Sequence, residues 1–480
     1  MRRASAILAT TAVGAAALAT GALSSAASGP PAIHQQAELA RRIVIGADAV
    51  RDGSPPSGAF FTAQNRTDAA ANGVAGPATG PYFAHQPIQG ISALVPASGG
   101  TWWALADNGY GTRDTSADWQ LVVYRVDPRP ATPVLAQTVI LSDPNHKVPW
   151  QTVCDPTHGT ALPPLTFNAL PASPPPACGS NPSATRILTG FDFDPESIEI
   201  GADGTFWIGE EFGPFVLHAD RQGRLLDTPV AAPGAKSPQN PTLDVAHGEK
   251  PTVAQSRGFE AMAISPDRKT LYPMFEGPLA ADDPQDVRIM TFDIQSHSFT
   301  KASRKLRLEM PGAKVNLTAL TLTNGAPAYP GSVAPTGTGG ESAPELTALD
   351  ANRFLFLERD GNGDGAAAPR FKKVFVVDGR TQGGYVTKSL LVDLMAVPDP
   401  LHVGNDGDFF RFPFNTIESV HVVDDHTIVV ANDNNYPFSN GRARSLSVDR
   451  SGPLAPDANE VIAVTVTSSL KPDHRLLASP

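Results

Sequence analysis

Cysteine pairs at metal-binding spacing, histidine clusters and long apolar runs are all missing from this chain of 480 residues. Only two cysteines occur, Cys154 and Cys178, and they flank a Pro-rich loop. The eleven histidines show no zinc-site spacing, so the cysteine pair predicts a disulfide in an exported protein rather than a metal site. After residue 27 no stretch approaches the roughly 18–20 apolar residues that a membrane-spanning helix needs.

Two catalytic signatures are also absent. The chain has no G-x-S-x-G sequence, which argues against a lipase-type serine nucleophile. It has no R-H-G-x-R-x-P sequence either, which argues against the histidine acid phosphatase mechanism. Catalysis through a covalent intermediate on either of these motifs is therefore not expected.

Charged residues make up only 18% of the chain, and the net charge is −11. An acidic surface argues against nucleic acid and anionic membranes as partners and fits a soluble, cation-binding monomer. The 46 prolines and 42 glycines indicate many turns rather than long helices. Hydrophobic residues reach 41%, which is enough for a substantial core.

The N-terminal segment 1–27 has the features of an export signal. Arg2 and Arg3 precede a small-residue apolar run from Ala6 to Leu23, and Ser25-Ala26-Ala27 offers a cleavage site. We expect a mature protein that is secreted, periplasmic or held at the cell surface. Residues 28–84 then predict a tail and loop, with one strand candidate at Arg42–Ile45.

The stretch from Gly190 to Leu226 predicts a β-hairpin with a third strand at Phe215–Asp220 and a fourth at Arg224–Leu226 behind it. Glu196 opens an alternating strand, Ala202-Asp203-Gly204 forms a turn, and the returning strand ends at Glu210 and Glu211. Because the start of one hairpin strand lies beside the end of the next, these carboxylates meet at one edge. Their mutual repulsion indicates a cation or a cationic ligand at that edge.

The same layout recurs along the chain. A polar residue opens a strand, a turn follows, and an acidic residue closes the second strand 13 to 16 positions later. The opening residues are Ser92, Glu196, Glu260, Glu345 and Glu418, and the closing residues are Asp107, Glu210/Glu211, Glu276, Glu358 and Asp433. Repeated hairpins of this kind predict an all-β fold, a single β-propeller of five to six blades over residues 85–470 with Pro-rich insertions. Pairing of Arg42–Ile45 with Val461–Val466 would close the ring.

Several of these segments resemble the phytase-like (esterase-like activity of phytase) propeller family. The matching segments are Gly190-Phe-Asp-Phe-Asp-Pro-Glu-Ser-Ile-Glu, Trp207-Ile-Gly-Glu-Glu-Phe-Gly-Pro-Phe, Gly258-Phe-Glu-Ala-Met-Ala, Leu357-Glu-Arg-Asp, Ile417-Glu-Ser-Val and Asp433-Asn-Asn. The likeness covers about residues 85–440. It implies a secreted or periplasmic propeller hydrolase. Ser92 stands where the other hairpins carry glutamate, so the acidic ring is not fully repeated.

The repeated acids define a candidate site at one mouth of the propeller. Oxygen ligands suit Ca²⁺, and a bound ion could activate a water molecule. The predicted metal ligands are Asp107, Glu196, Glu210, Glu276, Glu345, Glu358, Glu418 and Asp433. The predicted catalytic residues are Glu211, Glu260 and Arg359, and Arg257 and Arg288 are expected to bind the substrate.

The leading functional hypothesis is metal-assisted hydrolysis of a small phosphate ester or other ester. Two alternatives stay open on the sequence. The first is lactone hydrolysis by a propeller that also uses a cation held by carboxylates and amides. The second is an extracellular binding scaffold in which Ca²⁺ is purely structural.

Overall fold

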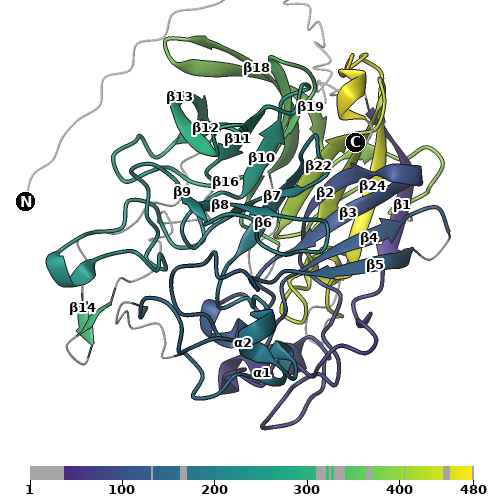
Figure 1. Cartoon of the computed structure of the whole chain (residues 1–480). Coiled ribbons are helices and arrows are strands. Elements are labelled where there is room, and N and C mark those ends of the chain that lie inside the picture. The colour runs from purple at the N-terminus through teal and green to yellow at the C-terminus, as the bar shows by residue number, and fades with distance from the viewer. Residues whose placement is uncertain are drawn as a thin grey trace, which may run out of the picture. The chain divides into compact units, whose positions relative to one another are not determined.

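The computed structural model describes most of the chain (Figure 1). The described residues are 37–130, 133–162, 170–309, 321–323, 326–328, 341–363, 369, 371–404, 406–446 and 455–477. One compact unit extends from Gln35 to Pro480, and a separate unit, Met1–His34, lies outside the described residues. The predicted export signal at 1–27 falls in that separate unit.

The fold is mostly β, and its strands form antiparallel meanders of four. Two of these meanders are separate sheets whose strands follow chain order. The first contains β2 (Ile91–Ala97), β3 (Thr101–Ala106), β4 (Val122–Asp127) and β5 (Val134–Ile140). The second contains β6 (Pro195–Ile200), β7 (Phe206–Glu210), β8 (Phe215–Ala219) and β9 (Val230–Ala231).

Two further meanders join into one eight-stranded sheet. One contains β10 (Ala261–Ile264), β11 (Thr270–Met274), β12 (Asp286–Asp293) and β13 (Ser298–Arg307). The other contains β16 (Glu341–Ala348), β17 (Arg353–Asp360), β18 (Lys372–Gln382) and β19 (Tyr385–Asp393). Their outer strands β13 and β19 meet at a parallel bridge between Lys305 and Tyr385.

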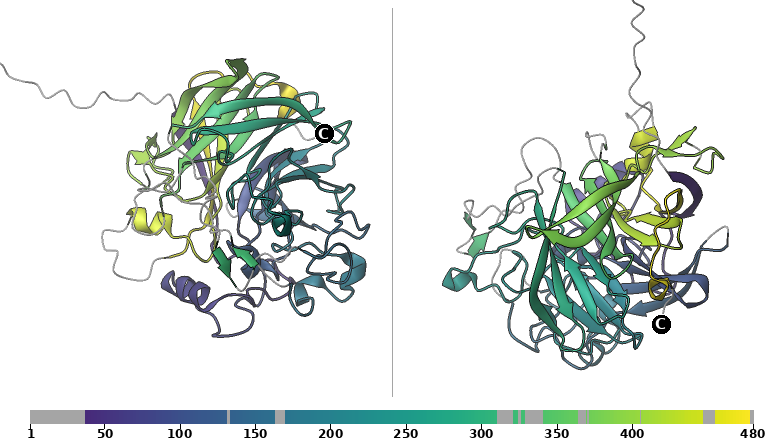
Figure 2. Two further views of the ribbon diagram at one scale, coloured as in Figure 1. Left: turned by 90° about the vertical axis from the view of Figure 1, so that its left-hand side faces the viewer. Right: turned by 90° about the horizontal axis from the view of Figure 1, so that it is seen from above.

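The last meander is completed by the N-terminal strand. Its members are β22 (Ile417–Val422), β23 (Thr427–Asn432), β24 (Asn459–Val466) and β1 (Ala37–Ile45). The predicted pairing is confirmed, because Arg42–Ile45 lies opposite residues 459–462 of β24. The purple β1 and the yellow β24 run side by side (Figure 2). The N-terminal strand therefore becomes the outer strand of this sheet and does not start a further one.

The remaining elements are short. They comprise β14 (Thr321–Thr323) with β15 (Ala326–Ala328), β20 (Val397–Pro398) with β21 (Phe409–Phe410), and the helices α1 (Ala63–Ala71), α2 (Pro182–Thr185) and α3 (Gly441–Leu446). No helix of the described residues has the length and apolarity required to cross a bilayer.

The first strands of the five meanders lie together in a ring. β2 contacts β6, β6 contacts β10, β10 contacts β16, β16 contacts β22, and β22 contacts β2 again. Their labels gather near the centre of Figure 1, whereas outer strands such as β5 and β18 lie further out. The inner strands are almost entirely buried, and β6 and β22 are buried at every position. Residues at one end of these strands therefore converge.

Two local expectations need correction. The segment before β2 is not a plain loop: α1 begins with a capping box between Thr62 and Asn65, and Phe61 packs against Tyr82 with ring centroids 5.2 Å apart. The fourth strand of the second sheet is β9, not Arg224–Leu226. Leu225 forms only an isolated bridge with Ala219, since its own N–H donates to Ser142 O at 2.9 Å, although Leu226 N still donates to His218 O at 2.9 Å.

A disulfide and a buried arginine hold the Pro-rich insertion in place. Cys154 and Cys178 form the predicted disulfide. Arg186 is fully buried beside it and donates to Asp143 at 3.2 Å and to Asp155 at 2.6 Å. A buried guanidinium paired on both sides orders a segment whose composition alone indicates only loop.

Candidate functional site

β-Bulges mark the opening strands of the hairpins. In β2, β6 and β22 the register shifts across one residue, and that extra residue is Ser92, Glu196 or Glu418. A bulge leaves its extra residue out of the ladder and re-aims the side chain. The polar residue that opens each of these strands therefore faces away from its own sheet.

Side chains from the opening and closing ends of the hairpins line one open cavity of about 150 Å³. Eight carboxylates and two guanidinium groups dominate its wall. The lining residues are Asp107, Asn108, Gly111, Asp194, Glu196, Glu211, Ser256, Arg257, Glu260, Glu276, Arg359, Thr416, Glu418, Asp433 and Asn435. They come from every meander of the ring, so the cavity lies where the inner strands converge.

The carboxylate oxygens lie close enough to share a metal ion. Three overlapping groups each have ligand atoms within 4.8 Å of one another. The groups are Asp194/Glu196/Glu211, Glu196/Glu260/Glu418 and Glu211/Glu260/Glu276. Glu196, the most accessible of these acids, is only 8% exposed. Oxygen donors gathered at this spacing suit a hard cation such as Ca²⁺.

One part of the cavity contains only acids; we call Asp107, Asp194, Glu196, Glu211 and Asp433 the acidic half. Within the described part of the chain none of the five forms an ion pair. Backbone amides orient four of them: Asn108 N donates to Asp194 (3.2 Å), Gly109 N to Asp107 (2.8 Å), Gly258 N to Glu211 (2.8 Å) and Asn435 N to Asp433 (2.7 Å). The fold thus positions these carboxylates without neutralising them.

Gly258 shows how tightly this half is packed. A Cβ atom at that position would lie 2.5 Å from the Glu211 Cα atom, so only glycine lets the two backbones approach. The approach is what brings the Gly258 amide to the Glu211 carboxylate.

Burial and mutual repulsion raise the pKa values of these acids. Burial raises the pKa of Asp107 to about 7, and Glu418 adds to the shift. The pKa of Glu196 rises well above its usual range, first through burial and then through Glu260 and Asp194. Burial followed by Glu260 does the same to the pKa of Glu211. A bound cation would favour the ionised forms.

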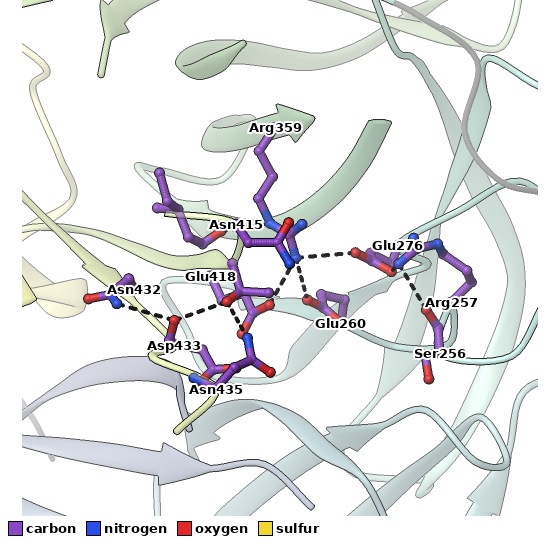
Figure 3. Close-up of polar contacts among 12 residues, drawn as sticks. Ser256, Arg257, Glu260, Glu276, Arg359, Asn415, Glu418, Asn432, Asp433 and Asn435 are labelled. Atoms are coloured by element: carbon purple, nitrogen blue, oxygen red, sulfur yellow. Dashed lines mark hydrogen bonds and ion pairs between the residues drawn. The ribbon is translucent and has the colours of Figure 1, made fainter. Parts of the chain in front are cut away.

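The other part of the cavity contains two arginines; we call Arg257, Glu260, Glu276, Arg359 and Glu418 the arginine half (Figure 3). Nη2 of Arg359 lies 2.9 Å from Glu418, 3.5 Å from Glu276 and 3.9 Å from Glu260. Arg257 donates to Glu276 from the other side. Each acid of this half therefore lies beside a cation.

Each of the two arginines keeps a donor that has no partner in the described part of the chain. Arg359 bonds through Nε to Ile417 O (3.2 Å) and through Nη2 to the carboxylates, so its Nη1 has no partner among the described residues. The Nε of Arg257 is buried without a partner. Unused guanidinium donors on a cavity wall can bind an anionic group.

Two predicted ligands, Glu210 and Glu358, face away from the cavity. Glu210 accepts hydrogen bonds from the amides of Phe212, Gly213 and Phe215 at 2.7–2.9 Å. Glu358 is paired with Lys388 in the neighbouring part of its own sheet. The physical reason is the alternation of side chains along a strand, which turns the next residue, Glu211 or Arg359, toward the cavity instead.

Glu345 and Arg288 are also outside the cavity. The register of the β16 hairpin shifts between Ser342 and Glu345, so Glu345 already lies past the bulge, buried and accepting from Leu346 N at 2.7 Å. Arg288 on β12 forms a two-pronged ion pair with Asp282 at 2.6 and 2.7 Å. The structure brings the other predicted residues together: Asp107, Glu196, Glu211, Arg257, Glu260, Glu276, Arg359, Glu418 and Asp433.

Sequence reasoning did not select Asp194 as a site residue. It lies two positions before Glu196 in the Asp-Pro-Glu segment, just outside β6, and its backbone carbonyl accepts from Glu211 N at 3.0 Å. The amides Asn108 and Asn435, together with Ser256 and Thr416, were likewise not selected. The only sequence feature that could have indicated these residues is that each lies within a few positions of a predicted site residue.

The chain belongs to the phytase-like family, described as esterase-like activity of phytase. The family model matches residues 86–436, which include every residue of the acidic half and the arginine half. The chain is also 26% identical over 300 residues to an uncharacterized secreted protein of Arthroderma benhamiae. That match covers 55% of this chain and 55% of the relative, so the chain spans about half the length of the curated relative it matches.

Solved structures with a similar chain course are remote. A luciferin-regenerating enzyme is 9% identical with a TM-score of 0.34, and the match covers 90% of this chain and 98% of that one. A calcium-binding protein, regucalcin, from Agrobacterium tumefaciens is 9% identical with a TM-score of 0.33, over 90% of this chain and 96% of that one.

Proposed function

We propose that the chain is a secreted hydrolase of phosphate esters that uses a divalent cation, with Ca²⁺ as the ion that fits best. The observation that carries this proposal is the division of one cavity into an acidic half that forms no ion pair within the described residues and an arginine half whose guanidinium groups keep donors without a partner there. Such a division suits a cation and an anionic group bound next to each other.

The residues of the acidic half fit the cation. Asp194, Glu196 and Glu211 offer oxygens within 4.8 Å of one another, and Asp107 and Asp433 line the same wall. Carboxylates and carbonyls are the ligands that Ca²⁺ takes, six to eight at a time. When bound, the ion would lower the pKa of a coordinated water and neutralise substrate charge.

The arginine half fits the substrate. Arg359 and Arg257 would donate to the non-bridging oxygens of a phosphate group and hold it against the acidic half. A neutral ester would leave these donors unused, and so the two arginines favour a phosphate ester over a carboxylic ester or a lactone. Arg359 is held in place by its Nε bond to Ile417 O and by Glu418.

Glu260 lies on the border of the two halves. Glu260 belongs to two of the three carboxylate clusters: it lies with Glu196 and Glu418 in one and with Glu211 and Glu276 in the other. Burial, followed by Glu418, raises its pKa well above the usual range. A carboxylate with a raised pKa beside a bound phosphate is placed to take a proton from the attacking water.

The proposed fold is a five-bladed propeller with the cavity at one mouth. Its support is the closed ring of contacts among β2, β6, β10, β16 and β22, with β1 completing the last meander. Export is proposed from the signal-like residues 1–27 and the Cys154–Cys178 disulfide, and the curated relative carries the description secreted.

The test is turnover of p-nitrophenyl phosphate, p-nitrophenyl acetate and phytate by purified protein, first with Ca²⁺ and then with chelator. The proposal expects phosphate ester turnover that chelator removes and added Ca²⁺ restores. If no substrate turns over while chelator lowers the melting temperature, the cation is structural and the chain is a binding scaffold. Turnover of only the acetate would overturn the role given to the arginines.

A further inference from the structure

A second polar cluster lies apart from the carboxylate cavity, between two neighbouring meanders. Its members are His218 on β8, Asp227 in the loop before β9, and His297 in the turn between β12 and β13. Nδ1 of His218 lies 2.6 Å from Oδ2 of Asp227, and Nδ1 of His297 lies 3.2 Å from the same oxygen. Two imidazole nitrogens therefore converge on one carboxylate oxygen.

The hydrogen bonds around His218 fix which of its nitrogens carries a hydrogen. The Thr205 hydroxyl donates its only hydrogen to Asp203 (2.7 Å) and lies 2.9 Å from Nε2 of His218. Nε2 must then donate to Thr205, which leaves Nδ1 of a neutral ring with its lone pair facing Asp227. A lone pair and a carboxylate oxygen at 2.6 Å need a positive charge between them.

A proton on Nδ1 would supply that charge to His218 alone, whereas a single metal ion would supply it to both rings at once. The same oxygen of Asp227 lies 3.2 Å from Nδ1 of His297, and this nitrogen offers a lone pair in one of the two neutral tautomers of the ring. The three ligand atoms lie within 4.8 Å of one another, as the ligands of one ion do. Thr205 acts as the outer partner that holds the His218 ring in its ligating orientation.

The surroundings suit a bound ion as well. Trp207 stacks on His218 with ring centroids 3.9 Å apart and an interplanar angle of 6°, which fixes one wall. The side chain of His218 is 10% exposed, whereas Asp227 and His297 are 37% and 41% exposed. The cluster is therefore rigid on one side and open to solvent on the other, which gives an ion an entry path.

We propose that His218, Asp227 and His297 bind a divalent transition-metal ion, with Zn²⁺ as the best match. The bound ion would cross-link the meander that contains β8 to the β12–β13 hairpin. Imidazole with one carboxylate suits Zn²⁺, whereas the all-oxygen cavity suits Ca²⁺. The two sites would thus select different metals. This proposal does not depend on the proposed hydrolase activity.

The chain contains a matched comparison. His146, Asp155 and His158 form a second group of the same composition, and His146 has the same 41% exposure as His297. Both residues also have a positive φ, 53° for His146 and 48° for His297. In that group, however, Asp155 already accepts from the buried Arg186 at 2.6 Å. A fixed guanidinium beside the carboxylate disfavours a metal ion there.

The experiment is a calorimetric Zn²⁺ titration of chelator-treated full-length protein in excess Ca²⁺, with tryptophan emission followed in parallel. The wild type is expected to bind one equivalent of Zn²⁺ and to change its emission, because Trp207 contacts a ligand ring. His297→Ala and Asp227→Asn should each weaken binding by about tenfold or more, since loss of an outer partner alone costs 10–100-fold. His146→Ala should bind like the wild type.

Equal Zn²⁺ affinity in wild type and His297→Ala would overturn the proposal. So would the absence of any Zn²⁺ binding, or a loss that appears in His146→Ala instead. Melting temperatures recorded without metal show whether a variant is folded. Because Asp227 and His297 are both partly exposed, two independent variants report on the same site.

Discussion

The two halves of the carboxylate cavity contain the same kind of side chain but differ in what stands beside it. In the arginine half, Glu260, Glu276 and Glu418 all lie within 4 Å of the Arg359 guanidinium. In the acidic half, Asp194, Glu196 and Glu211 offer oxygens within 4.8 Å of one another, and none of the three has an ion-pair partner among the described residues. The protein gives every acid of the arginine half an ion-pair partner, whereas the acids of the acidic half form no ion pair within the described residues.

The size of the repulsion explains why this difference matters. Two unit charges 4 Å apart interact with about 4 kcal/mol at an effective dielectric constant of 20. Three ionised carboxylates within 4.8 Å would therefore cost a large part of the stability of a domain. The acids of the arginine half have a guanidinium beside them when they ionise, whereas those of the acidic half need a bound cation to relieve their repulsion.

Loss of Arg359 should give the largest effect. Arg359→Ala removes the ion-pair partner of buried Glu260 and Glu418, while Glu276 keeps Arg257, and breaking a buried pair in this way costs about 3–5 kcal/mol. Denaturant unfolding of the metal-free protein measures the loss. Adding Glu418→Gln to Arg359→Ala should recover part of the stability, because the most closely paired charge is removed as well. A loss below about 1 kcal/mol would contradict the balance described for this half.

Substitutions of the adjacent residues Glu210 and Glu211 should have different effects, one on stability and the other on activity. Glu211→Gln is expected to lower the cation-dependent kcat/KM by about 10²–10³, the usual cost of losing one preorganised polar group, with little change in melting temperature. Glu210→Gln serves as its matched control. It should lower stability by about 1–3 kcal/mol, because its carboxylate accepts three backbone hydrogen bonds, and leave the activity of the folded protein unchanged.

Cation removal should expose the acidic half directly. Saturation at 100 times the Kd stabilises a protein by about 2.7 kcal/mol, so chelator should lower the melting temperature by a corresponding amount. Asp194→Asn is expected to have opposite effects in the two states: it relieves repulsion and raises the melting temperature without metal, and it weakens stabilisation by Ca²⁺. If Asp194→Asn lowers both melting temperatures, the acid is structural rather than a ligand.

A carboxylate outside both halves provides the smallest and cleanest pH effect. Burial raises the pKa of Glu199, on β6, to about 8. The folded-state pKa is above the unfolded value, which is near 4.3. The contribution of Glu199 to folding stability is therefore fully present at low pH and is lost as pH rises through 8. Glu199→Gln should therefore raise stability at pH 8 by about 1–3 kcal/mol and leave it unchanged near pH 4. Thermal melts at the two pH values measure the difference.

The repeated hairpins could be predicted because each strand pair alternates clearly and ends in a turn. The disulfide and the pairing of Arg42–Ile45 with the last strand were also predicted and are present. The outer strands β13 and β19 were not predicted. Most of their residues are polar and partly exposed, as in Ser298–Arg307, so they lack the buried alternation that marks the inner strands.

The cavity was predicted only in part, and the errors at the glutamates have one origin. Glu196 and Glu418 reach the cavity because each is the extra residue of a bulge, while Glu345 lies just past one. Glu210 and Glu358 lie outside the cavity because the side chain of the next residue in the chain, near the end of the strand, faces it instead. A shift of one residue reverses the face of a side chain, and the sequence does not reveal where a bulge begins.

The claim that the acidic half binds a divalent cation is tested most directly by a calorimetric Ca²⁺ titration of chelator-treated protein. The wild type should bind Ca²⁺, and Asp194→Asn should weaken that binding by about tenfold or more, as loss of one ligand charge does. Arg257→Gln should leave the affinity equal or higher, because it removes a positive charge from the other half. Absence of Ca²⁺ binding, or equal weakening by both substitutions, would contradict the division of the cavity.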